Sequence, residues 1–104
     1  MIQGLFYNHL SESYTKVEFD SPADIFRTNT FTIIGACIEK NLIMVGLENA
    51  FNFPVSNIDS DILSQFIFDE HPRGDVLFIE TDEKGIPISL NFELIYYPIY
   101  YNGC

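Results

Sequence analysis

The two histidines are the side chains best suited to general acid–base chemistry near neutral pH. His9 lies in a polar stretch near the N-terminus, and His71 precedes Pro72, which disfavours helical geometry in the residue before it and so marks the expected end of a helix. Neither histidine lies in a motif that pairs it with a nucleophile or a carboxylate at fixed spacing. We therefore expect both to have structural or incidental roles.

The two cysteines are equally weak candidates for reactive groups. Cys37 lies between Ala36 and Ile38 in an apolar run, which is typical of a small buried hydrophobic residue with no charge to stabilise a thiolate. Cys104 is the final residue. This pair gives neither a disulfide framework nor a metal-binding spacing, so a reducing compartment, the cytoplasm, fits the sequence best.

Motifs for catalysis, metal binding and cofactor binding are missing from the sequence. The nearest approach to a metal site is Asp69-Glu70-His71 followed by Asp75, but three adjacent residues do not point one way on a regular element, and zinc and calcium spacings are not present. No nucleophile elbow, phosphate-binding loop or dinucleotide fingerprint occurs. The sequence predicts a protein that is not an enzyme and uses no metal and no cofactor.

The charge balance is the strongest global signal. The 104 residues include fifteen Asp and Glu against five Lys and Arg, a formal net charge of -10. Such a field repels nucleic-acid backbones and anionic membrane surfaces, and it attracts a basic partner. The longest apolar runs fall far short of the ~20 residues that span a bilayer, and the N-terminus lacks the pattern of a secretory signal. We expect no direct contact with nucleic acid or with a membrane.

The acidic residues concentrate in the second half of the chain. Residues 59–104 hold nine acidic and two basic residues, a net charge of -7. Eight of these acids fall close together in sequence, and we predict that they bind a partner: Asp59, Asp61, Asp69, Glu70, Asp75, Glu80, Asp82 and Glu83. If they share one surface, they would steer a basic protein towards it. The alternative is that they are ordinary helix-start and turn residues.

The tyrosines near the C-terminus are the second predicted contribution to such a surface. The segment 96–101 contains four tyrosines, among which Tyr97 and Tyr100 are the predicted partner-binding residues. Tyrosine buries a large area at small entropic cost and is enriched at the centres of protein interfaces. The alternative is that half of these tyrosines complete the hydrophobic core.

The elements of the first half read as strands around one short helix. We expect strands at residues 2–7 and 16–20, and the second of these alternates, with Val17 and Phe19 on one face. Ser21-Pro22-Ala23-Asp24 predicts a helix that starts with Ser21 as N-cap and Pro22 in its first turn. Residues 31–39 and 42–48 flank Lys40-Asn41 and predict a hairpin in the middle of the sheet, covered on both faces.

The second half predicts a longer helix and a second hairpin. Apolar residues from Ile58 to Ile67 fall on one side of a helix of about three turns, with Ser56 as N-cap and an end by His71. Residues 76–81 predict a strand, residues 82–85 a tight turn with Gly85 at positive φ, and residues 86–96 a long returning strand. Within that strand we expect four residues to face inward: Ile88, Leu90, Phe92 and Leu94.

These elements define the expected fold class. Residues 1–104 form a single α+β domain, with a curved antiparallel or mixed sheet of six to seven strands and two helices packed against it. The hydrophobic content of 47%, with ten Phe and six Tyr, is ample for one core and excludes intrinsic disorder.

The small size, the acidity and the Tyr-rich stretch from Asp59 to Tyr101 resemble the immunity proteins that neutralise bacterial toxin domains, particularly those of contact-dependent growth inhibition systems. The resemblance implies an antitoxin with a cognate toxin, often a basic nuclease, whose active site the immunity protein covers. A phage or plasmid protein that mimics DNA and inhibits a host nuclease is the alternative, although the acidic stretch is too local for an array of carboxylates at phosphate spacing. A small enzyme or ligand-binding domain with a histidine-lined pocket is the third possibility.

Overall fold

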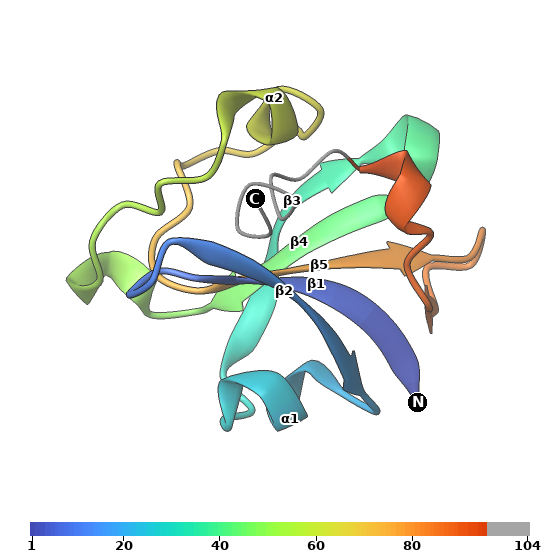
Figure 1. Ribbon diagram of the computed structural model, residues 1–104, viewed down its shortest axis with the longest axis horizontal. Helices are drawn as coiled ribbons and strands as arrows, with labels where there is room; N and C mark the ends of the chain where they lie inside the picture. The colour runs from blue at the N-terminus through green and yellow to red at the C-terminus, as the bar shows by residue number, and fades with distance from the viewer. Residues whose placement is uncertain (96–104) are drawn as a thin grey trace, which may run out of the picture.

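The computed structural model describes residues 1–95, which form six strands, two short α-helices and three 3-10 helices (Figure 1). In chain order these elements are β1 (Ile2–Asn8), β2 (Ser13–Phe19), α1 (Pro22–Phe26), β3 (Phe31–Cys37), η1 (Ile38–Lys40), β4 (Leu42–Leu47), η2 (Ala50–Asn52), α2 (Ser60–Leu63), β5 (Val76–Thr81), β6 (Pro87–Ile88) and η3 (Phe92–Leu94).

All six strands join one antiparallel sheet. The strand order is β2-β1-β5-β4-β3, and β6 adds to β5 beside the end of β1. Two hairpins, β1–β2 and β3–β4, therefore flank β5, and α1 and α2 lie on opposite sides of the sheet (Figure 1). The predicted α+β class, with a sheet of six or seven strands and two helices, is confirmed.

Strand β5 occupies the centre because its side chains are apolar on both faces. Val76, Leu77, Phe78 and Ile79 are each at most 1% exposed. Since successive side chains of a strand point to opposite faces, Val76 and Phe78 join one core and Leu77 and Ile79 join another. Burying an apolar side chain of this size contributes about 1.5–3 kcal/mol, so this strand is the main source of cohesion.

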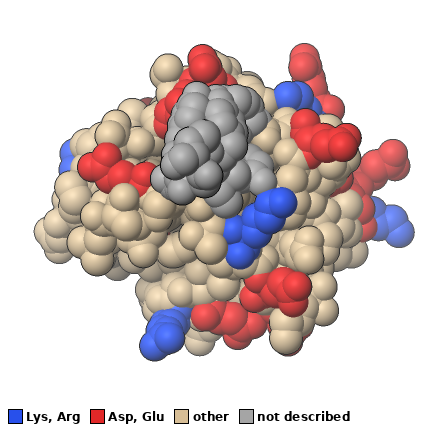
Figure 2. Space-filling model, in the orientation of Figure 1, with Lys and Arg blue, Asp and Glu red and all other residues tan. Residues whose placement is uncertain are grey.

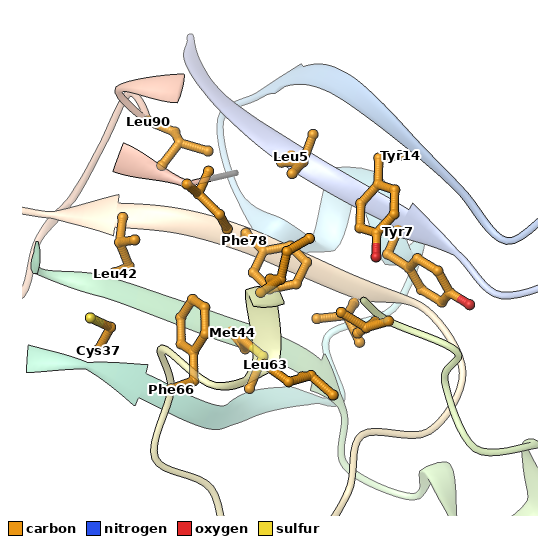
Figure 3. Close-up of a cluster of buried hydrophobic side chains, with 14 residues drawn as sticks. Leu5, Tyr7, Tyr14, Cys37, Leu42, Met44, Leu63, Phe66, Phe78 and Leu90 are labelled. Carbon is orange, nitrogen blue, oxygen red and sulfur yellow. The ribbon is translucent and has the colours of Figure 1, made fainter. Parts of the chain in front are cut away.

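The larger core lies between the sheet and the segments around α2. Phe78 lies near its centre, with Leu5 of β1 and Met44 of β4 on the neighbouring strands (Figure 3). Phe66, which follows α2, packs with its ring 5.6 Å from that of Phe78. The smaller core lies on the other face, where Phe26 of α1 contacts the rings of β1 and β3.

Helix α1 forms as its local sequence predicts. The Ser21 hydroxyl accepts the backbone N–H of Ala23 at 3.3 Å, and the Asp24 carboxylate accepts the backbone N–H of Ser21 at 3.2 Å. This reciprocal capping box satisfies donors that the first helical turn leaves unpaired. Arg27, with φ of 58°, ends the helix after five residues.

The β3–β4 hairpin forms as predicted, but its predicted place in the sheet is wrong. Asn41 takes a positive φ of 54° at the connection. Strand β3 is the outermost strand of the sheet, and its Ile33 side chain is 61% exposed. Strand β5, not this hairpin, is central in the sheet: β4 pairs with β5 on its other side, and the apolar residues of β5 are more completely buried than those of β3.

The predicted three-turn helix after Ser56 is also wrong. Helix α2 has four residues, and Asp59, not Ser56, is its N-cap. Ser56 is buried and donates its hydroxyl to the Gly74 carbonyl at 2.6 Å, while Ile67 exchanges two backbone hydrogen bonds with Ala36 of β3. These tertiary hydrogen bonds override the helical spacing of the apolar residues.

No helix within residues 1–95 is long and apolar enough to cross a membrane.

The turn after β5 is confirmed, whereas the long returning strand is wrong. Gly85 has a φ of 83°, and β6 contains only Pro87 and Ile88 before the chain leaves the edge of β5. The Leu90 N–H then donates to the Gln3 carbonyl at 2.8 Å. Strand β1 already occupies the rest of the β5 edge, so the returning chain cannot continue along it.

The four residues predicted to face inward in the returning strand have different environments. Leu90 is buried, and Phe92 and Leu94 pack partly buried against the larger core. Ile88 is 36% exposed, so the prediction that it faces inward is wrong. Leu90, Phe92 and Leu94 still alternate with the exposed residues Ser89, Asn91 and Glu93, although the chain has left the β5 edge and turns into η3.

Close packing between β1 and β5 generates a stability prediction. A Cβ added at Gly4 would lie 2.9 Å from the Phe78 carbonyl oxygen, which is backbone and cannot yield. A Cβ at Gly46 would also meet an atom at 2.9 Å, but that atom is the mobile end of the Ile34 side chain. We expect Gly4→Ala to lower the free energy of unfolding by about 1–3 kcal/mol and Gly46→Ala by less than about 1 kcal/mol, measured by urea unfolding. Equal losses in the two variants would contradict the packing described for β1.

Candidate functional site

The eight predicted partner-binding acids divide between the two ends of β5. Asp75 immediately precedes this strand and Asp82 immediately follows it, which separates them by roughly 20 Å. The end at Asp75 is the one where Gly46 of β4 pairs with Val76. The structure therefore does not bring all eight acids together, and on the face shown in Figure 2 the acidic residues lie in several separate places.

The acids at the Asp82 end of β5, called the far end, mainly accept hydrogen bonds from nearby backbone N–H groups. One Asp82 carboxylate oxygen accepts the backbone N–H groups of Lys84 and Ile86, each at 2.9 Å. Glu80 accepts the backbone N–H of Asn91 at 2.8 Å. Glu83 is exposed at the turn. For Asp82, the interpretation as a turn residue accounts for these contacts, whereas Glu80 lies within β5.

At the opposite end of β5, where the strand begins, Asp75 forms the best defined polar contact. Its Oδ1 atom lies 2.6 Å from His9 Nδ1 and also accepts the His9 backbone N–H at 2.9 Å. The His9 side chain is only 13% exposed, and its ring packs edge-on against Phe53. This contact fixes the β1–β2 turn to the segment that enters β5, so His9 and Asp75 have a structural role.

Two buried tyrosines hold the segment before α2. The Asn57 backbone N–H donates to the Tyr7 hydroxyl at 2.9 Å, and the Asp59 backbone N–H donates to the Tyr14 hydroxyl at 3.1 Å. The two rings lie side by side at one end of the larger core (Figure 3). Burial raises the pKa of Tyr7, and it raises the pKa of Tyr14 to about 12, because the phenolate would lose its hydration.

Asp69 and Glu70 remain as exposed acids without a structural contact, and they line a cleft. This open cleft of about 350 Å³ lies between the ends of β3 and β4 and the loop that precedes β5. Glu48, which follows β4, adds a third carboxylate, and Arg73 and His71 also line the cleft. Asp61, on α2, is exposed but does not line it.

Sequence reasoning missed Glu48 and the exposed apolar residues of the cleft. Phe51 is 72% exposed and Ile33 is 61% exposed, and both line it. The signal available for Ile33 was a run of nearly continuous apolar residues, which was interpreted as a strand covered on both faces in the middle of the sheet. Tyr97 and Tyr100 lie outside the described residues, so the structure does not place them.

The other candidate reactive groups have different environments. His71 is exposed and lines the cleft, as the third possibility from the sequence requires, and it donates from Nε2 to the Ser56 carbonyl at 3.0 Å. Cys37 is buried in the larger core. Within residues 1–95, His, Cys, Asp and Glu side chains form no group of three or more that could hold a metal ion.

Within residues 1–95 the acidic residues have two basic partners, the Met1 amino group beside Asp20 and His9 beside Asp75. Every Asp, Glu, Lys and Arg of the chain lies within residues 1–95, and in this part no Lys or Arg side chain lies within 4.0 Å of a carboxylate. The basic residues have other contacts: Lys40 donates to Gln65 and to the Leu94 carbonyl, and Arg73 donates to the Phe53 carbonyl. The negative field of the chain is therefore not neutralised from within.

The chain was compared with protein-family models, curated proteins and solved structures, and none of them matches it. Its function must therefore be inferred from its own residues.

The His9–Asp75 contact predicts that one member of the acidic stretch acts on stability. Asp75→Ala removes the acceptor for two donors and should lower the free energy of unfolding by about 1–3 kcal/mol. Asp69→Ala, at an exposed carboxylate with no such contact, is the matched control and should change it by less than about 0.5 kcal/mol. Urea unfolding measures both values. Coincident unfolding curves for these variants would show that the contact does not stabilise the fold.

The buried tyrosines predict a pH dependence at alkaline pH. The pKa of Tyr14 in the folded state, about 12, lies above the value of ~10 in an unfolded chain. Between these pH values the unfolded chain binds fewer protons than the folded one, so stability falls as pH rises from about 10 towards 12. Tyr14→Phe should flatten this fall, although it removes an acceptor and lowers stability at neutral pH. An unchanged slope in urea unfolding across this window would contradict the environment described for Tyr14.

Proposed function

We propose that this chain is a non-enzymatic, stoichiometric inhibitor of a basic protein, of the immunity-protein type. Its target is a basic nuclease toxin domain, whose active site it covers with an acidic surface. The supporting observation is the complete lack of Lys or Arg partners for the carboxylates of residues 1–95. The net charge is -10, and the ion pairs within residues 1–95 are those of the Met1 amino group with Asp20 and of His9 with Asp75, so most carboxylates remain available to an external cation.

These charges have two physical consequences. They attract a basic partner over a long range, and their mutual repulsion destabilises the unbound chain. Like charges on a small domain repel one another, and a basic partner relieves that repulsion on binding. Electrostatic steering raises the association rate and falls with ionic strength, since exposed charges are screened over about 8 Å at physiological salt. An inhibitor that must capture a toxin before it damages nucleic acid benefits from fast association.

The cleft acids are the best candidates for direct contact with the toxin. Asp69, Glu70 and Glu48 come from two segments far apart in the sequence and line one cleft, whereas Asp82 and Glu80 serve local backbone contacts. A nuclease active site contains cationic groups that hold phosphate oxygens, and carboxylates are the side chains that can replace those oxygens.

An inhibitor that mimics DNA is less well supported. Such a protein needs a regular row of carboxylates along an extended face, because the phosphates of DNA repeat at fixed spacing. The acids that were predicted to form one surface instead divide between the two ends of β5. The toxin-inhibitor hypothesis needs only a local group of carboxylates, and the cleft supplies one.

The decisive test is a titration of the chain against a basic nuclease toxin domain, taken from the secreted effector where one is encoded immediately upstream of this chain. Nuclease activity should fall linearly and reach zero at one equivalent of the chain, because inhibition is by complex formation without turnover. The association rate should fall on the order of ten-fold or more between low salt and high salt. A basic nuclease from an unrelated system is the control and should keep its activity. No inhibition at several equivalents, or inhibition well below one equivalent, would exclude this function.

A further inference from the structure

Within residues 1–95, the outer edge of β3 has backbone groups without a hydrogen-bond partner. The Glu48 N–H donates to the Thr30 carbonyl, and the β3–β4 register places these residues opposite each other. Because hydrogen-bonded and non-hydrogen-bonded pairs alternate in an antiparallel ladder, the amides and carbonyls of Phe31 and Ile33 point away from β4. Ala36 is the β3 residue whose outward groups are paired within residues 1–95, through its bridge to Ile67.

The two outer strands of the sheet differ in how they are protected against pairing. Strand β2 carries Lys16 and Glu18, and charged side chains on an edge disfavour the addition of another strand. Strand β3 contains no charged residue and no proline. Its protection consists of an irregularity between Ile33 and Gly35 and the bridge at Ala36, both of which leave residues 30–33 accessible.

Exposed apolar side chains surround this part of the edge. Ile33 lies on the same face of β3 as Phe31, which packs in the smaller core, but Ile33 itself is 61% exposed. Phe51, which lines the adjoining cleft, is 72% exposed, and Ile67 beside the bridge is 74% exposed. Large apolar side chains that gather at an open strand edge are typical of a protein-binding site.

The charge of the cleft specifies the partner. The cleft meets this edge at Thr32, Ile33 and Ile34, and of these Thr32 points to the opposite face of β3 from Ile33. The cleft holds the carboxylates of Glu48, Asp69 and Glu70 together with the guanidinium of Arg73, which already donates to the Phe53 carbonyl. An incoming strand places alternate side chains on opposite faces of the sheet. One set would enter the acidic cleft, and the other would cover Ile33.

We propose that β3 receives an extended segment of the basic partner protein as an added antiparallel strand. The segment pairs with residues 30–33 over about four residues, places Lys or Arg in the acidic cleft and packs apolar side chains on Ile33. This inference rests on the proposed function, since it identifies the surface by which the chain binds its basic partner. The antiparallel direction matches every other strand pair in the sheet.

A synthetic peptide tests the edge without the toxin. The probe is a fluorescent six-residue peptide of alternating Lys and Val, measured by fluorescence polarisation against the full chain. Two further peptides carry N-methyl groups either on all Val amides or on all Lys amides, which removes the N–H donors of one peptide edge and keeps the charge and the side chains. In antiparallel addition the residues facing Ile33 also direct their N–H groups at β3, so methylation at Val should weaken binding about ten-fold or more and methylation at Lys about two-fold or less.

Matched variants of the chain separate the edge from general charge attraction. Ile33→Lys should weaken peptide binding about ten-fold, whereas Ile86→Lys, at a residue of similar exposure beyond the far end of β5, should change it about two-fold or less. The triple variant Glu48→Gln, Asp69→Asn, Glu70→Gln should weaken binding more than Glu18→Gln, Glu83→Gln, Glu93→Gln, which removes the same charge from exposed acids elsewhere. Amide chemical shifts should change at residues 30–34 and 69–73.

Several results would overturn the inference. Equal loss with both methylated peptides, or equal loss in both triple variants, would show attraction by charge alone. Shift changes along β2 would move the site to the other edge, and a dimer of the chain that Ile33→Lys dissociates would make a second copy the occupant. If the toxin is inhibited but Ile33→Lys inhibits it equally well, the proposed function stands and this surface is wrong. If the peptide binds as described but no basic nuclease is inhibited, the surface stands and the proposed function fails.

Discussion

The structure depends on the burial of one strand from both sides. Strand β5 supplies Phe78 and Val76 to the larger core and Leu77 and Ile79 to the smaller one, and it is the only strand described in residues 1–95 that pairs with both hairpins. The hairpins themselves share no hydrogen bonds in the sheet order. The two cores on opposite faces of the sheet, the position of α2 and the entry of the loop that carries Asp69 and Glu70 all follow from where this strand lies.

Against this cohesive centre, the surface carries an electrostatic cost that the fold does not offset. Its carboxylates are used as helix caps, turn acceptors and one histidine contact, and none of those in residues 1–95 pairs with Lys or Arg. Surface ion pairs contribute little to stability, so their absence costs the fold little. The same absence leaves a field that acts on other molecules, which is why charge is more informative about function here than any single motif.

Local signals in the sequence predicted local structure well. The helix start at Ser21 and Pro22, the hairpin connection at Lys40-Asn41 and the Gly85 turn depend on neighbours a few residues away, and the structure confirms all three. The apolar run of β5 also sufficed to predict its bounds. Such features require no knowledge of the rest of the fold.

The failures arose where a distant partner decides the conformation. The apolar residues at helical spacing after Ser56 do not form one helix, because Ile67 pairs with Ala36 and Ser56 bonds to Gly74. The prediction of the candidate site failed in part for the same reason. Glu48 joins Asp69 and Glu70 across a cleft that exists only once the sheet is formed, whereas Asp82 is near them in sequence but lies at the other end of β5.

The late position of β5 in the chain has a consequence for synthesis. Residues 1–47 contain both hairpins in full, but the inner strand of each must wait for residues 76–81 before its second edge is paired. A ribosome has therefore made more than two thirds of the chain before the sheet can join into one body. A nascent chain that stops before this strand contains two separate hairpins, and the apolar side chains that β5 would cover on each remain exposed.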